Sequence, residues 1–193
     1  AQFSLKRIVR KSPSLGAKPP RGAVVLFDGT KESMKNWQGG RFDEKTGLLN
    51  TDGNDIRTKQ KFLNYIMHVE FMLPFKPDAR SQGRGNSGFY QVDMYEMQIL
   101  DSFGLMGLNN ECGGIYQKAD SKVNMCLPPL QWQVYDVDFN SAVMKDAKKV
   151  SNAVLTARLN GVTIHEQLQI NGKTGGARGE PEGTPGVIKL QGH

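Results

Sequence analysis

The sequence is poor in cysteine and histidine, with two and three residues among 193. Cys112 and Cys126 lack the Cys-x-x-Cys spacing of a zinc site, so they form either a disulfide or two buried thiols. A disulfide would indicate an oxidising compartment. The sequence also lacks an HExxH and a GxSxG motif, so it gives no support for a zinc protease or a serine hydrolase.

Long apolar runs are missing as well. No stretch approaches the ~20 apolar residues that span a bilayer, so we expect no membrane span. No signal peptide is visible, although the sequence begins at Ala1 without methionine, which leaves the removal of one open. The net charge of +6 is modest, and the dense basic residues near the N-terminus are not interleaved with aromatics. We therefore expect no nucleic-acid partner.

Glycine and proline are plentiful, with 22 and 9 residues, and turn-forming pairs separate many short apolar runs. We find about ten to twelve strand candidates and no convincing amphipathic helix. This pattern predicts an all-β fold, a two-sheet antiparallel sandwich of the jelly-roll type. Residues 1–22 are expected to form an extended arm, and residues 23–193 a single sandwich domain.

Alternating or apolar runs predict the individual strands. The runs used below are Ala23–Phe27, Phe62–Leu73, Phe89–Val92, Met94–Leu100, Cys112–Gln117, Trp132–Phe139 and Val187–Leu190.

The strongest local signal is Asn160-Gly161, which lies between two alternating runs and predicts a hairpin with a type I′ turn. Counting outward from the turn pairs Leu159 with Val162, Arg158 with Thr163, Ala157 with Ile164 and Thr156 with His165. His165 would thereby share a face with Arg158, opposite the apolar face.

The stretch Asn86–Asp101 carries the most suggestive chemistry. Within Met94–Leu100, three apolar residues point to one face, and Glu96 and Gln98 point to the other. A carboxylate and an amide on the polar face of such a strand suggest a site with a sheet as its floor. A solvated outer face of a sandwich explains the same pattern.

Other polar and aromatic residues on non-core strand faces could complete a sugar site. Enzymes that act on sugars need a carboxylate or imidazole that exchanges protons, and an aromatic ring to stack on the sugar. Besides Glu96 and Gln98, the candidates are Glu70, Asp136 and His165, with Trp132 as the aromatic platform.

A retaining glucanase is disfavoured. The series Glu96-x-Gln98-x-x-Asp101 has the spacing of such enzymes, but glutamine occupies the middle position, where they carry an acid. In a regular strand Asp101 would also point away from Glu96 unless a bulge intervened.

Short motifs spread from residue 24 to the last residue together resemble the 3-keto-disaccharide hydrolase domain family. They are Leu26-Phe27-Asp28-Gly29-Thr30 with Trp37 following, Asn86-Ser87-Gly88, Tyr95 to Asp101, Cys112-Gly113-Gly114-Ile115-Tyr116, Trp132-Gln133-Val134-Tyr135, Leu159-Asn160-Gly161-Val162 with His165 following, Thr174-Gly175-Gly176 and Leu190-Gln191-Gly192-His193. The resemblance implies a concanavalin A-like fold, export from a bacterial cell, and cleavage of glycosides already oxidised at C3. Glu166 and Gly192 depart from the family pattern, and Gly192 weakens any role for His193.

That activity has a physical logic. A ketone at C3 makes the C2 proton acidic, so a base can remove it and the C1 substituent leaves by β-elimination. The site needs a base, a donor for the enolate oxygen and an acid for the leaving group, but no second carboxylate. The resemblance thus suggests Glu96 or His165 as base, Gln98, Asn86 or Arg158 as donor, and His193 as acid or ligand.

The sequence leaves open whether a divalent metal polarises the ketone, and also the sugar, hydrolysis against elimination, and the oligomeric state. The alternative function is a non-catalytic carbohydrate-binding module on the same fold, which predicts glycan binding through Trp132 without turnover. Either function makes a carbohydrate the expected partner.

Overall fold

The structure is a computed structural model that describes residues 3–6 and 8–193, so Ala1, Gln2 and Arg7 of the predicted arm lie outside the described residues. The described residues form thirteen strands and two short 3-10 helices, η1 (Lys31–Asn36) and η2 (Ser81–Gly83). The strands are β1 (Trp37–Gln38), β2 (Arg41–Asp43), β3 (Leu48–Asn50), β4 (Ile56–Thr58), β5 (Tyr65–Met72), β6 (Ser87–Gln91), β7 (Tyr95–Ile99), β8 (Trp132–Asn140), β9 (Val143–Lys145), β10 (Lys148–Ser151), β11 (Ala153–Leu159), β12 (Val162–Ile170) and β13 (Lys189–Leu190). The all-β prediction is confirmed. Neither helix in these residues is long and apolar enough to cross a bilayer.

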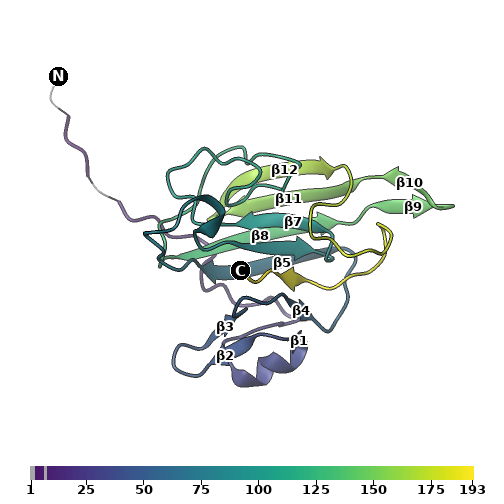
Figure 1. Ribbon diagram of the computed structural model, residues 1–193, viewed down its shortest axis with the longest axis horizontal. Helices are drawn as coiled ribbons and strands as arrows, with labels where there is room; N and C mark the ends of the chain where they lie inside the picture. The colour runs from purple at the N-terminus through teal and green to yellow at the C-terminus, as the bar shows by residue number, and fades with distance from the viewer. Residues whose placement is uncertain (1–2, 7) are drawn as a thin grey trace.

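Two antiparallel sheets form the body of the molecule (Figure 1). One has five strands in the order β1-β4-β13-β6-β7, and the other has four in the order β12-β11-β8-β5. Two ribbons, β2-β3 and β9-β10, are appended. β13 comes last in sequence but pairs with both β4 and β6, so the end of the chain completes the middle of the five-stranded sheet.

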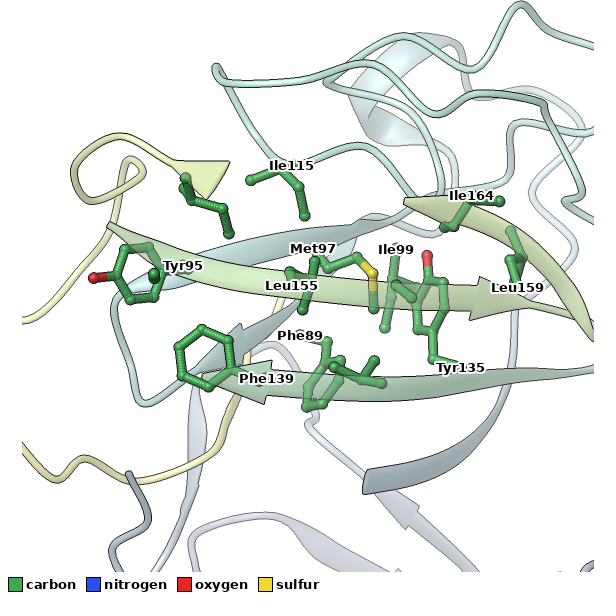
Figure 2. Packing of buried hydrophobic residues seen from close by; sticks show 14 of the residues in the cluster. Phe89, Tyr95, Met97, Ile99, Ile115, Tyr135, Phe139, Leu155, Leu159 and Ile164 are labelled. Carbon is green, nitrogen blue, oxygen red and sulfur yellow. The ribbon is translucent and has the colours of Figure 1, made fainter. Parts of the chain in front are cut away.

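The two sheets pack against each other through one apolar cluster (Figure 2). The five-stranded sheet contributes Phe89 and Met97, and the four-stranded sheet contributes Tyr135, Phe139 and Leu155, all fully buried. Burial of each such side chain contributes about 1.5–3 kcal/mol. Because alternate residues of β6 and β7 fill this core, the residues between them face outward and are available to a site.

The predicted hairpin is present as β11 and β12, but its register changes after the first pairs. Asn160 and Gly161 have φ of 54° and 83°, which the type I′ turn requires. Leu159 pairs with Val162 and Arg158 with Thr163, as expected, whereas irregularities between Leu155 and Arg158 bring Ala157 opposite His165. The expected pairings of Ala157 with Ile164 and of Thr156 with His165 are therefore wrong, because bulges shift the face to which later residues point. His165 is buried and does not share the exposed face of Arg158.

Two predicted strands are wrong. Residues 23–27 form no strand: the side chains of Asn36 and Trp37 donate to the carbonyls of Val25 and Leu26, so side chains replace a strand partner there. Residues 112–117 form a tight loop with isolated bridges at Ile115. Positive φ values of 91° at Gly113 and 61° at Gln117 prevent an extended run.

Residues 14–16 of the arm contact the outer face of the four-stranded sheet. Ser14 Oγ donates to Asp136 at 2.6 Å, and the Gly16 N–H donates to Glu70. In the interior, Cys112 and Cys126 are both buried and both free. Of the two alternatives, a disulfide or two buried thiols, the structure has the two thiols.

Candidate functional site

Glu96 and Gln98 lie on the outer face of the five-stranded sheet, because the other residues of β7 fill the core. In the antiparallel pairing of β6 with β7, Tyr90 is opposite Glu96 and Gly88 is opposite Gln98. Lys189 of β13 is opposite Tyr90 on the other side. Neighbouring strands therefore place these side chains on one face of one sheet.

Glu96 is a buried carboxyl, with 3% of its surface exposed. The Tyr90 hydroxyl donates to Glu96 Oε2 at 2.7 Å, while Oε1 has no hydrogen-bond partner among the described residues. Burial raises the pKa of Glu96 to about 7, although the hydrogen bond from Tyr90 and the positive charge of Lys189 oppose this shift. Such a carboxyl can take up and return a proton near neutral pH.

Gly88 makes room for this carboxyl. A Cβ at position 88 would clash with Glu96 Oε1, and it would lie 2.9 Å from Glu96 Cδ and 2.9 Å from Tyr90 Cε2. A side chain at this position would therefore occupy the space in which the free carboxyl oxygen lies.

Lys189 is a buried cation beside the pair. Its Nζ lies 3.6 Å from the centroid of the Tyr90 ring, donates to the Gly176 carbonyl at 2.7 Å and lies 3.0 Å from Asp93 Oδ1. Arg57 Nε donates to the other oxygen of Asp93 at 3.1 Å. Lys189 thus packs on Tyr90 and is itself held by Asp93, which Arg57 pairs with in turn.

A row of side-chain amides lies next to Glu96. Gln98 Nε2 donates to Asn86 Oδ1 at 2.9 Å and to Gln82 Oε1 at 3.1 Å, which uses both of its protons. Asn86 Nδ2 has no acceptor among the described residues. In this row Asn86 Nδ2 therefore keeps both of its protons available, whereas Gln82 Nε2 donates one to the Asn110 carbonyl at 2.8 Å.

Two loops cover the face around Glu96. The Glu96 N–H donates to Thr174 Oγ1 at 2.9 Å, and the Tyr90 hydroxyl lies 2.9 Å from the Gly175 carbonyl. On the other side, the Tyr116 N–H donates to the Glu96 carbonyl at 3.1 Å. The loops 174–176 and 112–119 therefore shield Glu96 from bulk water.

Three of the predicted binding residues lie elsewhere. Glu70, Trp132 and Arg158 are on β5, β8 and β11, and they point outward from the four-stranded sheet. Glu70 contacts His68 Nε2 at 3.1 Å and accepts the Gly16 N–H of the arm. The structure does not bring these three residues to Glu96.

Neither predicted histidine forms a hydrogen bond with Glu96 in the described part of the chain. His165 is 3% exposed, and its Nε2–H donates to the Gly113 carbonyl at 2.7 Å. Burial lowers the pKa of His165, so this side chain is neutral at pH 7. His193 is exposed and follows Gly192, whose N–H donates to Asp55 next to β4.

Sequence reasoning missed Tyr90, Asp93 and Lys189. The one signal for Lys189 was a single cation inside the apolar run Val187–Leu190. A charge within such a run is buried only when the fold supplies partners, and Asp93 is distant in sequence.

One cavity in the described residues includes none of the site residues. It measures about 310 Å³ and is lined by Ala23, Val24, Leu26, Gln60, Phe62, Tyr65, Ile66, Met67 and Ile188. This lining has no carboxylate or imidazole, so it offers no acid or base. In the described part of the chain no group of three or more His, Cys, Asp or Glu is arranged to hold a metal ion.

The raised pKa of Glu96 predicts a pH-dependent gain in stability for Glu96→Gln. The unfolded carboxyl titrates near 4.5 and the folded one near 7. Between these values the folded state binds more protons than the unfolded state, so the free energy of unfolding falls with rising pH, by about 3 kcal/mol in total. Glutamine has no proton to lose, so urea unfolding should show the variant to be more stable at about pH 8 and nearly unchanged at about pH 4. An equal difference at both pH values would contradict the assignment.

Comparison with solved structures supports the fold and one functional class. A candidate glycosyl hydrolase from Parabacteroides distasonis ATCC 8503 is 28% identical, with a TM-score of 0.81 over 100% of this chain and 87% of that chain. A second such protein from the same organism is 17% identical, with a TM-score of 0.61 over 88% and 87% of the two chains, and shares the fold alone. No curated protein matches the sequence.

The sequence also matches a family profile over residues 22–193, nearly the whole chain. Together with the 28% identical relative, this match supports a function on glycosides. The chain belongs to the 3-keto-alpha-glucoside-1,2-lyase-like domain family.

Proposed function

We propose that this protein cleaves glycosides oxidised at C3 of the sugar, with Glu96 as the base. The observation that carries the proposal is one buried carboxyl with a pKa of about 7, one oxygen of which is held by Tyr90 while the other is left open. The family match supports the substrate class.

The chemistry requires a single base. Glu96 removes the proton from C2, and the electrons of the C2–H bond move toward the ketone to form an enolate. The C1–O bond then breaks, a C1=C2 double bond forms, and the proton on Glu96 passes to the departing oxygen. The first product is an unsaturated ketone, and the addition of water to it completes a net hydrolysis.

Asn86 is the donor that we assign to the developing enolate oxygen. Gln98 fixes the Asn86 amide by donating to its Oδ1, and Nδ2 has no acceptor among the described residues. A donor held in place before the reaction stabilises the enolate without reorganising. Gln98 thus acts through Asn86, and its own protons are already used.

The neighbouring carboxylates support one-base chemistry over the two-carboxylate mechanism of ordinary glycosidases. Asp101 accepts two hydrogen bonds from Arg84, at 2.6 and 3.1 Å, and Asp93 is paired with Arg57 and Lys189. Neither is available as a second catalytic acid. Glu96, by contrast, forms no ion pair with any of the described residues.

Turnover of a 3-keto-glucoside by the purified protein tests the proposal, with the parent glucoside as control. We expect release of the aglycone from the keto sugar alone, with a rise of kcat/KM with pH that has its midpoint near 7. Transient ultraviolet absorbance of the unsaturated ketone would identify elimination as the first step. Binding of the keto sugar without release of the aglycone would instead support a binding module and overturn the proposed activity.

A further inference from the structure

The Tyr90 hydroxyl has two acceptors and one proton. Its oxygen lies 2.7 Å from Glu96 Oε2 and 2.9 Å from the carbonyl oxygen of Gly175. Both distances are those of a hydrogen bond, but a phenol can donate only once. The direction of this bond therefore depends on whether Glu96 carries a proton.

We propose that Tyr90 is a positioning residue that reverses its hydrogen bond with Glu96 each time Glu96 gains or loses a proton. When Glu96 is a carboxylate, Tyr90 donates to Oε2. When Oε2 is protonated, Glu96 donates to the Tyr90 oxygen, and Tyr90 turns its own proton to the Gly175 carbonyl. No bond other than O–H···O contacts is made or broken in this exchange. The use of both states in one turnover rests on the proposed function.

The surroundings of Tyr90 fix its oxygen in place while its proton changes partner. Lys189 Nζ lies over the ring at 3.6 Å, a cation–π contact, and the same group donates to the Gly176 carbonyl. A Cβ at Gly176 would lie 2.7 Å from the Tyr90 oxygen. Glycine at this position therefore allows the 174–176 loop to approach closely enough to accept from Tyr90.

The turn between β6 and β7 has a strained backbone and carries the carboxylate that pairs with Lys189. Val92 and Asp93 have φ of 46° and 57°, and a positive φ is rare for a β-branched residue such as valine. This turn directs the Asp93 carboxylate to Lys189 Nζ at 3.0 Å and to Arg57 Nε at 3.1 Å. The strained turn thus anchors the cation that packs on Tyr90.

The charged groups around Glu96 come from each neighbouring element. Lys189 of β13 favours the carboxylate, whereas Asp55, which precedes β4, favours the protonated form. Asp93 and Arg57 act on Lys189. Tyr90 is the neutral group that contacts Glu96 directly, so its removal isolates the hydrogen bond from the charges.

Carbon-13 NMR of the substrate-free protein tests the proposal. In the wild type, we expect the Gly175 carbonyl carbon to shift with the same midpoint as the Glu96 carboxyl carbon, near 7. In Tyr90→Phe, the midpoint of Glu96 should rise by about one to two pH units, and the Gly175 carbonyl should stop following it.

Tyr95→Phe is the matched control, because the Tyr95 hydroxyl donates to Glu182 at the same 2.7 Å outside this network. It should leave both titrations unchanged. A Gly175 titration that persists in Tyr90→Phe, or an unchanged Glu96 midpoint, would overturn the proposal. Because no substrate is present, a lack of turnover on 3-keto-glucosides would refute the proposed function and leave this result standing.

The pH profile of turnover gives a second readout. In Tyr90→Phe the acid limb of kcat/KM should move upward by the same shift as the NMR midpoint. A simple loss of structure would instead lower activity at every pH without moving the limb.

Discussion

Glu96→Gln is expected to lower kcat/KM on a 3-keto-glucoside by about 10²–10⁴-fold, the usual contribution of a general base. Glutamine keeps the shape of the side chain and can still accept the hydrogen bond from Tyr90 through its carbonyl oxygen. What it loses is the ability to take a proton. Initial rates of aglycone release, measured above and below the midpoint of the wild-type profile, check this prediction.

Glu182→Gln is the matched control for this variant. Glu182 also accepts a hydrogen bond of 2.7 Å from a tyrosine hydroxyl, that of Tyr95, but it belongs to the loop after β12. Its replacement should leave kcat/KM within about twofold of the wild type, because it does not contact the reacting atoms. If Glu96→Gln retained wild-type turnover while folding normally, Glu96 would not be the base.

Gly88→Ala is expected to reduce kcat/KM by roughly 100-fold, since displacement of a catalytic group by about 1 Å has effects of this size. Gly88 has no positive φ, so alanine is compatible with its backbone, and the consequence comes from contact alone. The new methyl group would clash with Glu96 Oε1 and force the carboxyl away from its position.

The effect on stability should be smaller, about 1–3 kcal/mol, because one methyl group is added at a packed site. Steady-state kinetics and urea unfolding of the same preparation separate the two effects. Gly179→Ala is the control, because a Cβ there meets no atom within 4 Å and its φ is not positive. Normal turnover by a folded Gly88→Ala protein would show that the position of the carboxyl is unimportant.

The alternation of β7 was enough to place Glu96 and Gln98 on the outer face, and the Asn160-Gly161 pair was enough to predict the β11–β12 turn. Both signals are local, since they depend on the two-residue period of a strand and on the backbone preferences of a turn. The resemblance to the family was likewise confirmed over residues 22–193.

The rest of the site depends on contacts between residues far apart in sequence. Lys189 meets Asp93 because β13 inserts between β4 and β6, and no local pattern specifies that insertion. The position of His165 depends on bulges that shift the register of β12 relative to β11. Trp132 looked like a platform for a sugar ring, but β8 belongs to the sheet opposite Glu96. The face to which each side chain points could be predicted within one strand, whereas the way in which distant strands pair into sheets could not.

The central claim is that cleavage begins when Glu96 breaks the C2–H bond. A 3-keto-glucoside labelled with deuterium at C2 tests it most directly, with deuterium release and aglycone release followed together by NMR. The account predicts that every substrate molecule that the protein cleaves also loses its deuterium from C2. It further predicts that Glu96→Gln loses deuterium release and aglycone release together. Release of the aglycone with deuterium still bound at C2 would contradict it.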